Sequence, residues 1–116
     1  RHGMKVILGT PTYAAPAWVS RTYPEVLRWN FNRQPMEHGS RRNLNYTSPK
    51  YLDLSDRIVT ALAEHYRGEA QVVAWQLDNE FNCHMDVSYA PSDTAAFRDW
   101  LREKYGTLDA LNAAWG

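Results

Sequence analysis

The chain has 116 residues, a hydrophobic content of 44% and a balanced charge of 13 basic and 13 acidic side chains, which suits one small globular domain. The balanced charge argues against nucleic acid or an anionic membrane surface as a partner. No apolar run approaches the roughly 20 residues of a membrane span. Cys83 is the single cysteine, so an internal disulfide is excluded, and a reducing, cytoplasmic location is expected.

The first half of the chain predicts a strand, a long irregular segment and a helix. Residues 4–10 are mostly β-branched or apolar and lead into Gly-Thr-Pro, which is typical of a strand and its exit. Residues 19–47 have no sustained period and predict a long loop with at most one short helical turn. Ser48 and Pro49 predict a helix start, and Gly68 is expected to end that helix after an apolar stripe.

The second half predicts another strand followed by two helices. Residues 72–77 contain no glycine or proline and are mostly β-branched, aromatic or aliphatic, as in a buried parallel strand. After a second irregular stretch, Ser92 and Asp93 are expected to open a helix that ends at Gly106. Thr107 is expected to cap a short final helix. The β-α-β-α order implies a parallel sheet with right-handed crossovers.

Two strands do not make a parallel sheet that can stand alone. A strand buried on both faces needs neighbours on both edges and helices above and below it. The predicted elements amount to about two β-α units, about a quarter of a barrel of roughly 250 residues. We therefore expect an α/β fold, a partial (β/α)8 TIM barrel, with residues 1–116 as a fragment of a larger catalytic domain that exposes its strands when isolated.

Polar residues follow both predicted strands. Asp78, Asn79 and Glu80 come directly after the second strand, where they are compatible with an ordinary polar turn. They are also compatible with a site, because barrels place their chemistry at the carboxyl ends of the strands, and residues 10–12 would open onto the same face. If the strand continues, Asp78 and Glu80 point the same way with Cα atoms roughly 6.5 Å apart, a spacing compatible with a glycosidase carboxylate pair.

Several segments match one known family in the same order along the chain. They are residues 3–12, 16–18, 39–42, 48–51, 75–81, 96–101, 105–112 and 114–116. Together they resemble glycoside hydrolase family 42, the β-galactosidases. Residues 3–18 are similar to its third-strand region, and residues 75–81, Trp-Gln-Leu-Asp-Asn-Glu-Phe, to its fourth-strand signature. Many barrel glycosidases share Asn-Glu at a strand end, so the long collinear match makes the resemblance specific.

The resemblance implies roles for three residues in hydrolysis of terminal non-reducing β-D-galactose residues by a retaining mechanism. Glu80 would be the general acid/base, which requires a poorly solvated setting. Asn79 would bind the sugar near its 2-hydroxyl, and Arg41 would bind hydroxyls of the same galactose unit. From the residues alone, Arg41 is a solvated loop charge. The family's nucleophile is a second Glu on a later strand, which none of the acidic residues here matches, so the isolated chain is expected to be inactive.

The resemblance also bears on metals and partners. Some members of the family bind a structural zinc through a cysteine cluster, one position of which falls near Asn45. Cys83 with His84 and Asp86 makes a poor zinc spacing, so no metal and no cofactor are expected. The expected partner is a β-galactoside substrate, and a homo-oligomeric parent protein stays open.

Two alternatives to a β-galactosidase stay open. One is a non-catalytic carbohydrate-binding remnant, and the other is a different clan A barrel glycosidase that shares the Asn-Glu pair. Sequence downstream of Gly116 would discriminate between them. A Glu at the end of a later strand favours the β-galactosidase, its absence from the native gene favours the remnant, and a poor match elsewhere favours another glycosidase.

Overall fold

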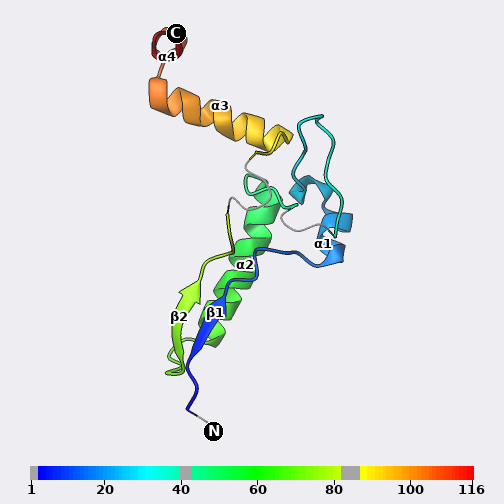
Figure 1. Cartoon of the computed structure of the whole chain (residues 1–116), viewed down its shortest axis with the longest axis vertical. Helices are drawn as coiled ribbons and strands as arrows, with labels where there is room; N and C mark the ends of the chain where they lie inside the picture. The colour runs from blue at the N-terminus through cyan, green and yellow to red at the C-terminus, as the bar shows by residue number, and fades with distance from the viewer. Residues whose placement is uncertain (1–2, 40–42, 82–86) are drawn as a thin grey trace.

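The computed structural model describes residues 3–39, 43–81 and 87–116. Its elements, in chain order, are β1 (Val6–Gly9), α1 (Ala17–Thr22), the 3-10 helix η1 (Pro24–Val26), α2 (Pro49–His65), β2 (Val72–Gln76), α3 (Pro91–Tyr105) and α4 (Leu108–Trp115). The molecule is elongated, with extents of 63 × 31 × 23 Å, and α3 and α4 lie at the end opposite to the start of β1 (Figure 1).

β1 and β2 pair in parallel, as the β-α-β-α order predicts, and together they form the two-stranded sheet of the described residues. Gly9 pairs with Gln76 at the ends of the two strands, and Thr10 N donates to Gln76 O at 2.9 Å just beyond them. Both strands therefore end at the same edge. The predicted second strand is one residue too long, because Leu77 already leaves the sheet and Asp78 turns the backbone with a φ of 54°.

The helix starts follow the sequence signals, with one correction. Ser48 caps α2, since its Oγ accepts from Tyr51 N at 3.4 Å. α3 begins at Pro91, not at Ser92 and Asp93, because proline suits the first helical position. Asp93 serves the helix start from within the first turn, where its carboxylate accepts from Ala90 N at 3.1 Å.

The helix ends show a second correction. α2 ends at His65 with Tyr66 as its cap, so Gly68 lies beyond the cap, where its φ of 78° serves the turn into β2. Gly106, with a φ of 71°, ends α3 as expected. Thr107 then caps α4 as expected, since its Oγ1 accepts from Ala110 N at 3.1 Å.

The segment expected to be a long loop carries more structure than predicted. It contains α1 and η1, and isolated antiparallel bridges join Leu27 to Leu44 and Trp29 to Pro35. It also contributes most of the buried apolar cluster of the described residues, which consists of Val19, Val26, Leu27, Leu44 and Tyr51. The sequence pattern predicts an apolar core around the strands. In this chain the buried apolar cluster lies instead in the segment that joins β1 to α2 and in the first turn of α2.

The same segment is tied to the start of α3 by side-chain hydrogen bonds. Asn45 Nδ2 donates to Ser92 Oγ at 2.7 Å, and Thr47 Oγ1 donates to Asp93 Oδ1 at 2.6 Å. Because α3 has no buried residue among those described and otherwise packs on α4, these bonds are a main link between α3 and the rest of the chain.

The strands are largely uncovered. Ile7 and Val73 in the strands expose 64% and 54% of their surface, and Leu77, just after β2, exposes 71%. The radius of gyration is 18.1 Å, whereas a compact chain of about 100 residues has a radius near 13 Å. Apolar strand residues of this kind are stable in a parallel sheet only when further strands and helices cover them. Across the described ranges, none of the helices is both long and apolar enough to cross a membrane.

We predict that residues 1–116, expressed alone, bind a hydrophobic dye and unfold on heating without a cooperative transition, because the strand faces are exposed. Light scattering and circular dichroism would measure this. As a matched variant, Ile7→Thr with Val73→Thr keeps the β-branched shape and should lower dye binding and aggregation. A soluble monomer with a cooperative melt would contradict the prediction.

Candidate active site

The polar residues that follow the two strands come together at the shared edge of the sheet, as the sequence predicts. Asp78 N, just after β2, donates to Thr10 Oγ1 at 2.7 Å, and Thr12 Oγ1 donates to Asp78 Oδ2 at 2.8 Å. These bonds join residues 68 and 66 positions apart in the chain. The strand ends therefore form one hydrogen-bonded unit.

Asp78 is the buried member of this unit, with 8% of its surface exposed. Its second carboxylate oxygen, Oδ1, accepts from Asn79 N at 2.6 Å. Gln76 Nε2 adds a brace from the last residue of β2, because it donates to Asp78 O and to Asn79 Oδ1 at 3.1 Å each. The burial of Asp78 is compatible with its charge because both oxygens accept hydrogen bonds.

The backbone at this strand end is unusual. Asp78 has a φ of 54° and Glu80 a φ of 42°, in the left-handed region that residues other than glycine rarely adopt. Such conformations cost on the order of 1–3 kcal/mol each and persist when surrounding contacts hold them. They cluster at functional sites, so this geometry favours a site over an ordinary polar turn.

The paired-carboxylate geometry is not what the structure shows. It required the strand to continue through Glu80, but β2 ends at Gln76 and the left-handed residues break the alternation of side chains. Asp78 is buried and bonded to Thr12, whereas Glu80 is exposed. The two carboxylates therefore occupy different environments, with Asp78 buried in the hydrogen-bonded unit and Glu80 exposed.

The other expected site residues divide into two groups. Asn79 is half-buried beside Asp78, at the same strand end as Glu80. Arg41 lies outside the described residues, and so does the whole Cys83, His84 and Asp86 pattern. Within the described ranges, no group of three or more side chains of the His, Cys, Asp and Glu types could hold a metal ion.

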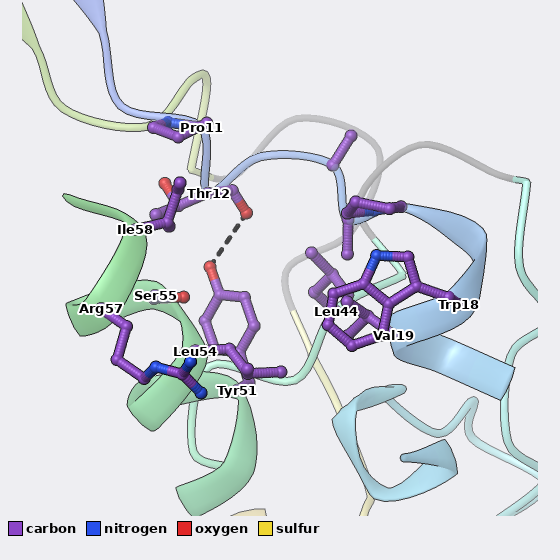
Figure 2. A pocket seen from close by; sticks show the side chains of 13 residues that line it. Pro11, Thr12, Trp18, Val19, Leu44, Tyr51, Leu54, Ser55, Arg57 and Ile58 are labelled. Atoms are coloured by element: carbon purple, nitrogen blue, oxygen red, sulfur yellow. Dashed lines mark hydrogen bonds between the residues drawn. The ribbon is translucent and has the colours of Figure 1, made fainter. Parts of the chain in front are cut away.

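A cavity of about 570 Å3 lies beside the segment that follows β1 (Figure 2). Its walls are mostly apolar and come from α1, α2 and the chain between β1 and α1, with Trp18 and Ile58 among them, and from Leu44 in the segment before α2. Tyr51 reaches across from α2, and its hydroxyl donates to Thr12 O at 3.0 Å. Tyr51 thus holds the backbone of Thr12, whose side chain holds Asp78.

The hydrogen-bonding roles of Thr10, Thr12, Gln76 and Tyr51 are absent from the sequence-based prediction. The sequence places residues 10–12 on the same face as Asp78, because they follow the first strand. It does not show which residues they bond to. Gln76 lies in the predicted strand and Tyr51 in the predicted helix, and nothing in the sequence marks either as a partner of the strand ends. Strand pairing decides which residues from segments more than 60 positions apart become partners. The sequence pattern does not give the register of that pairing.

Polar residues at the shared carboxyl edge of parallel strands are typical of the sites of α/β enzymes, barrels among them. The chain belongs to the family of Glyco_hydro_42, β-galactosidase, whose family model matches residues 1–116. A β-galactosidase from Thermus sp. is 47% identical over 115 residues, which cover 98% of this chain and 18% of the relative. A second, from Thermus thermophilus, is 46% identical over 115 residues, with the same coverage of 98% and 18%.

Solved structures agree with this assignment. The β-galactosidase of the psychrophilic Marinomonas ef1 superimposes with a TM-score of 0.90 at 47% identity, over 97% of this chain and 17% of the other. The β-galactosidase of Halorubrum lacusprofundi gives 0.94 at 40% identity, over 99% and 17%. The fold is therefore α/β, about two β-α units of a (β/α)8 barrel, and the chain spans about a fifth of the length of the relatives it matches.

We predict that alkaline pH destabilises the full-length protein through Tyr51, whose pKa burial raises from 10.0 to about 12. Between pH 10 and pH 12 the phenol ionises in the unfolded chain but stays protonated in the folded one, so stability present below pH 10 is lost as the pH rises. The Tyr51→Phe variant should lose less of its thermal midpoint between pH 9 and pH 11 than the wild type. Equal losses would contradict the prediction.

Proposed function

We propose that residues 1–116 form a segment of the catalytic barrel of a retaining β-galactosidase, which hydrolyses terminal non-reducing β-D-galactose residues. The observation that carries this proposal is the position of Asn79 and Glu80 at the shared carboxyl edge of β1 and β2, in a chain that matches the family over its whole length. Barrel enzymes use this edge for chemistry.

Glu80 has the role of general acid/base in this proposal. As an acid it protonates the glycosidic oxygen while the bond to the sugar's anomeric carbon breaks. As a base it then removes a proton from the water that attacks the covalent glycosyl-enzyme. The exposed position of Glu80 in this chain leaves its carboxyl accessible, and the poorly solvated setting that such an acid needs comes from the remaining barrel and the bound sugar.

Asn79 and Arg41 bind the galactose unit in the same proposal. Gln76 Nε2 donates to Asn79 Oδ1 at 3.1 Å, and this bond holds the side-chain amide in one orientation next to Glu80. An oriented amide suits a hydrogen bond to the 2-hydroxyl, which strengthens in the transition state of such reactions. Arg41 supplies donors for further hydroxyls of the sugar.

The second carboxyl group is a Glu on a later strand, outside residues 1–116. Retaining hydrolysis runs on two carboxyl groups, so the reaction requires neither a metal nor a cofactor. The single cysteine of the chain supports a cytoplasmic site of action, and a β-galactoside is the proposed partner.

We predict that purified residues 1–116 show negligible turnover of a nitrophenyl β-galactoside, because no covalent intermediate forms without the nucleophile. Release of nitrophenol measures this, with the Glu80→Gln variant as a blank. Turnover by the wild-type segment that Glu80→Gln abolishes would contradict the prediction.

We predict that Glu80→Ala in the full-length protein lowers hydrolysis of a nitrophenyl galactoside about 10²–10⁴-fold. Azide should partly restore the rate with an activated substrate and give a galactosyl azide, because azide needs no general base and a good leaving group needs no acid. The control is Glu64→Ala, which removes an exposed carboxylate from α2 and should leave the rate unchanged.

Two outcomes would contradict the role of Glu80. One is a folded Glu80→Ala protein with undiminished activity on substrates that have poor leaving groups. The other is a folded, inactive Glu80→Ala protein that azide does not rescue. A full-length wild-type protein without turnover on β-galactosides would instead favour the non-catalytic, carbohydrate-binding remnant.

A further inference from the structure

The structure assigns a positioning role to the side chains that hold Asp78 to the exit of β1. We call Thr10, Thr12 and Asp78 the Thr–Asp clasp. We propose that the clasp sets the orientation of the Asp78–Asn79 peptide, and through it the direction in which the Glu80 carboxyl meets the leaving group. This inference rests on the proposed acid/base role of Glu80.

The clasp is a closed ring of hydrogen bonds between the two strand ends. Asp78 N donates to Thr10 Oγ1 at 2.7 Å, and Thr12 Oγ1 donates to Asp78 Oδ2 at 2.8 Å. The two threonine hydroxyls are 3.3 Å apart. Since a hydroxyl has one proton and Thr12 uses it on Asp78, Thr10 is the donor between them. Asp78 is thus held by its backbone and by its side chain.

The clasp acts on Glu80 through the backbone. Asp78 Oδ1 accepts from Asn79 N at 2.6 Å, so the carboxylate that Thr12 holds also fixes the peptide that enters Asn79. The next residue, Glu80, has a left-handed φ of 42°. Because the preceding backbone is held at several points, the direction in which the Glu80 side chain leaves the chain is also fixed. The clasp therefore acts on Glu80 through the backbone, as a positioning device, and does not share in proton transfer.

Asp78 itself is unsuited to be the second catalytic carboxyl. It exposes 8% of its surface, and both of its oxygens already accept hydrogen bonds, from Thr12 and from Asn79. A nucleophile needs an oxygen that can approach the anomeric carbon of the sugar. The geometry therefore gives the two acidic residues at this strand end different roles. Asp78 holds the backbone in place, and Glu80 transfers the proton.

The test is Thr12→Val in the full-length protein, which keeps the side-chain shape and removes the hydroxyl. The readout is kcat/KM for a phenyl and for a 2,4-dinitrophenyl β-galactoside. The phenyl leaving group needs a well-placed acid, whereas dinitrophenolate leaves without one. We expect about a tenfold loss with the phenyl substrate, in line with the cost of a small misplacement, and a much smaller loss with the dinitrophenyl substrate.

Two further variants complete the experiment. Thr12→Ser restores the hydroxyl and should recover most of the rate on the phenyl substrate. Asp78→Asn keeps the shape of the side chain, weakens its hydrogen bonds and should show the same dependence on the leaving group as Thr12→Val. Asp78→Asn also takes the place of Thr12→Val if the valine variant does not fold, as judged by circular dichroism.

Equal losses on both substrates would overturn the proposal, because they indicate less folded enzyme and not a misplaced acid. Unchanged rates on both substrates would overturn it as well. Glu80→Ala, assayed in parallel, separates this failure from failure of the proposed function. If Glu80→Ala discriminates between the leaving groups and Thr12→Val does not, the clasp proposal alone fails. If Glu80→Ala does not discriminate, the acid/base role itself is wrong.

Discussion

The contact between Asp78 and the two threonines after β1 is the interaction on which the candidate site depends. It joins the ends of strands that are separated in the chain by a long structured segment and by α2. It also stabilises a backbone that would otherwise be strained, since Asp78 has a left-handed φ of 54°. Without it the strand ends would still lie at the same edge and Gln76 would still hold Asn79, but the left-handed turn at Asp78 would lose the hydroxyls that hold it.

Some of the remaining residues support this contact, and others form apolar surfaces that further strands and helices of a barrel would cover. The buried cluster that includes Val26 and Tyr51 supports Thr12 through the hydrogen bond from Tyr51 to its carbonyl oxygen. The faces of the strands, in contrast, remain exposed, which agrees with a chain that spans 18% of its relatives. A site of this type is local in its hydrogen bonds but depends on the whole barrel for its stability and its exclusion of water.

The features that were predicted well from the sequence are those that depend on residues close together in the chain. Ser48 and Thr107 mark helix starts through side-chain oxygens that accept from the first turn, Gly106 marks a helix end through its left-handed backbone, and the structure agrees. The parallel strand order and the family assignment also follow from the sequence. The left-handed turn at Asp78 did not, because it depends on hydroxyls from the exit of another strand. The helical structure between β1 and α2 was likewise missed, since long-range burial of Val26, and not periodicity, organises it.

The bonds from Asn45 and Thr47 to the first turn of α3 have a consequence for protein engineering and for evolution. The segment after β1 and the segment after β2 form one mechanical unit at the rim, although they are encoded far apart in the gene. A loop exchange that replaced Asn45 and Thr47 by apolar residues would remove hydrogen-bond partners from Ser92 and Asp93. An exchange at this position in the chain should therefore transfer both segments together.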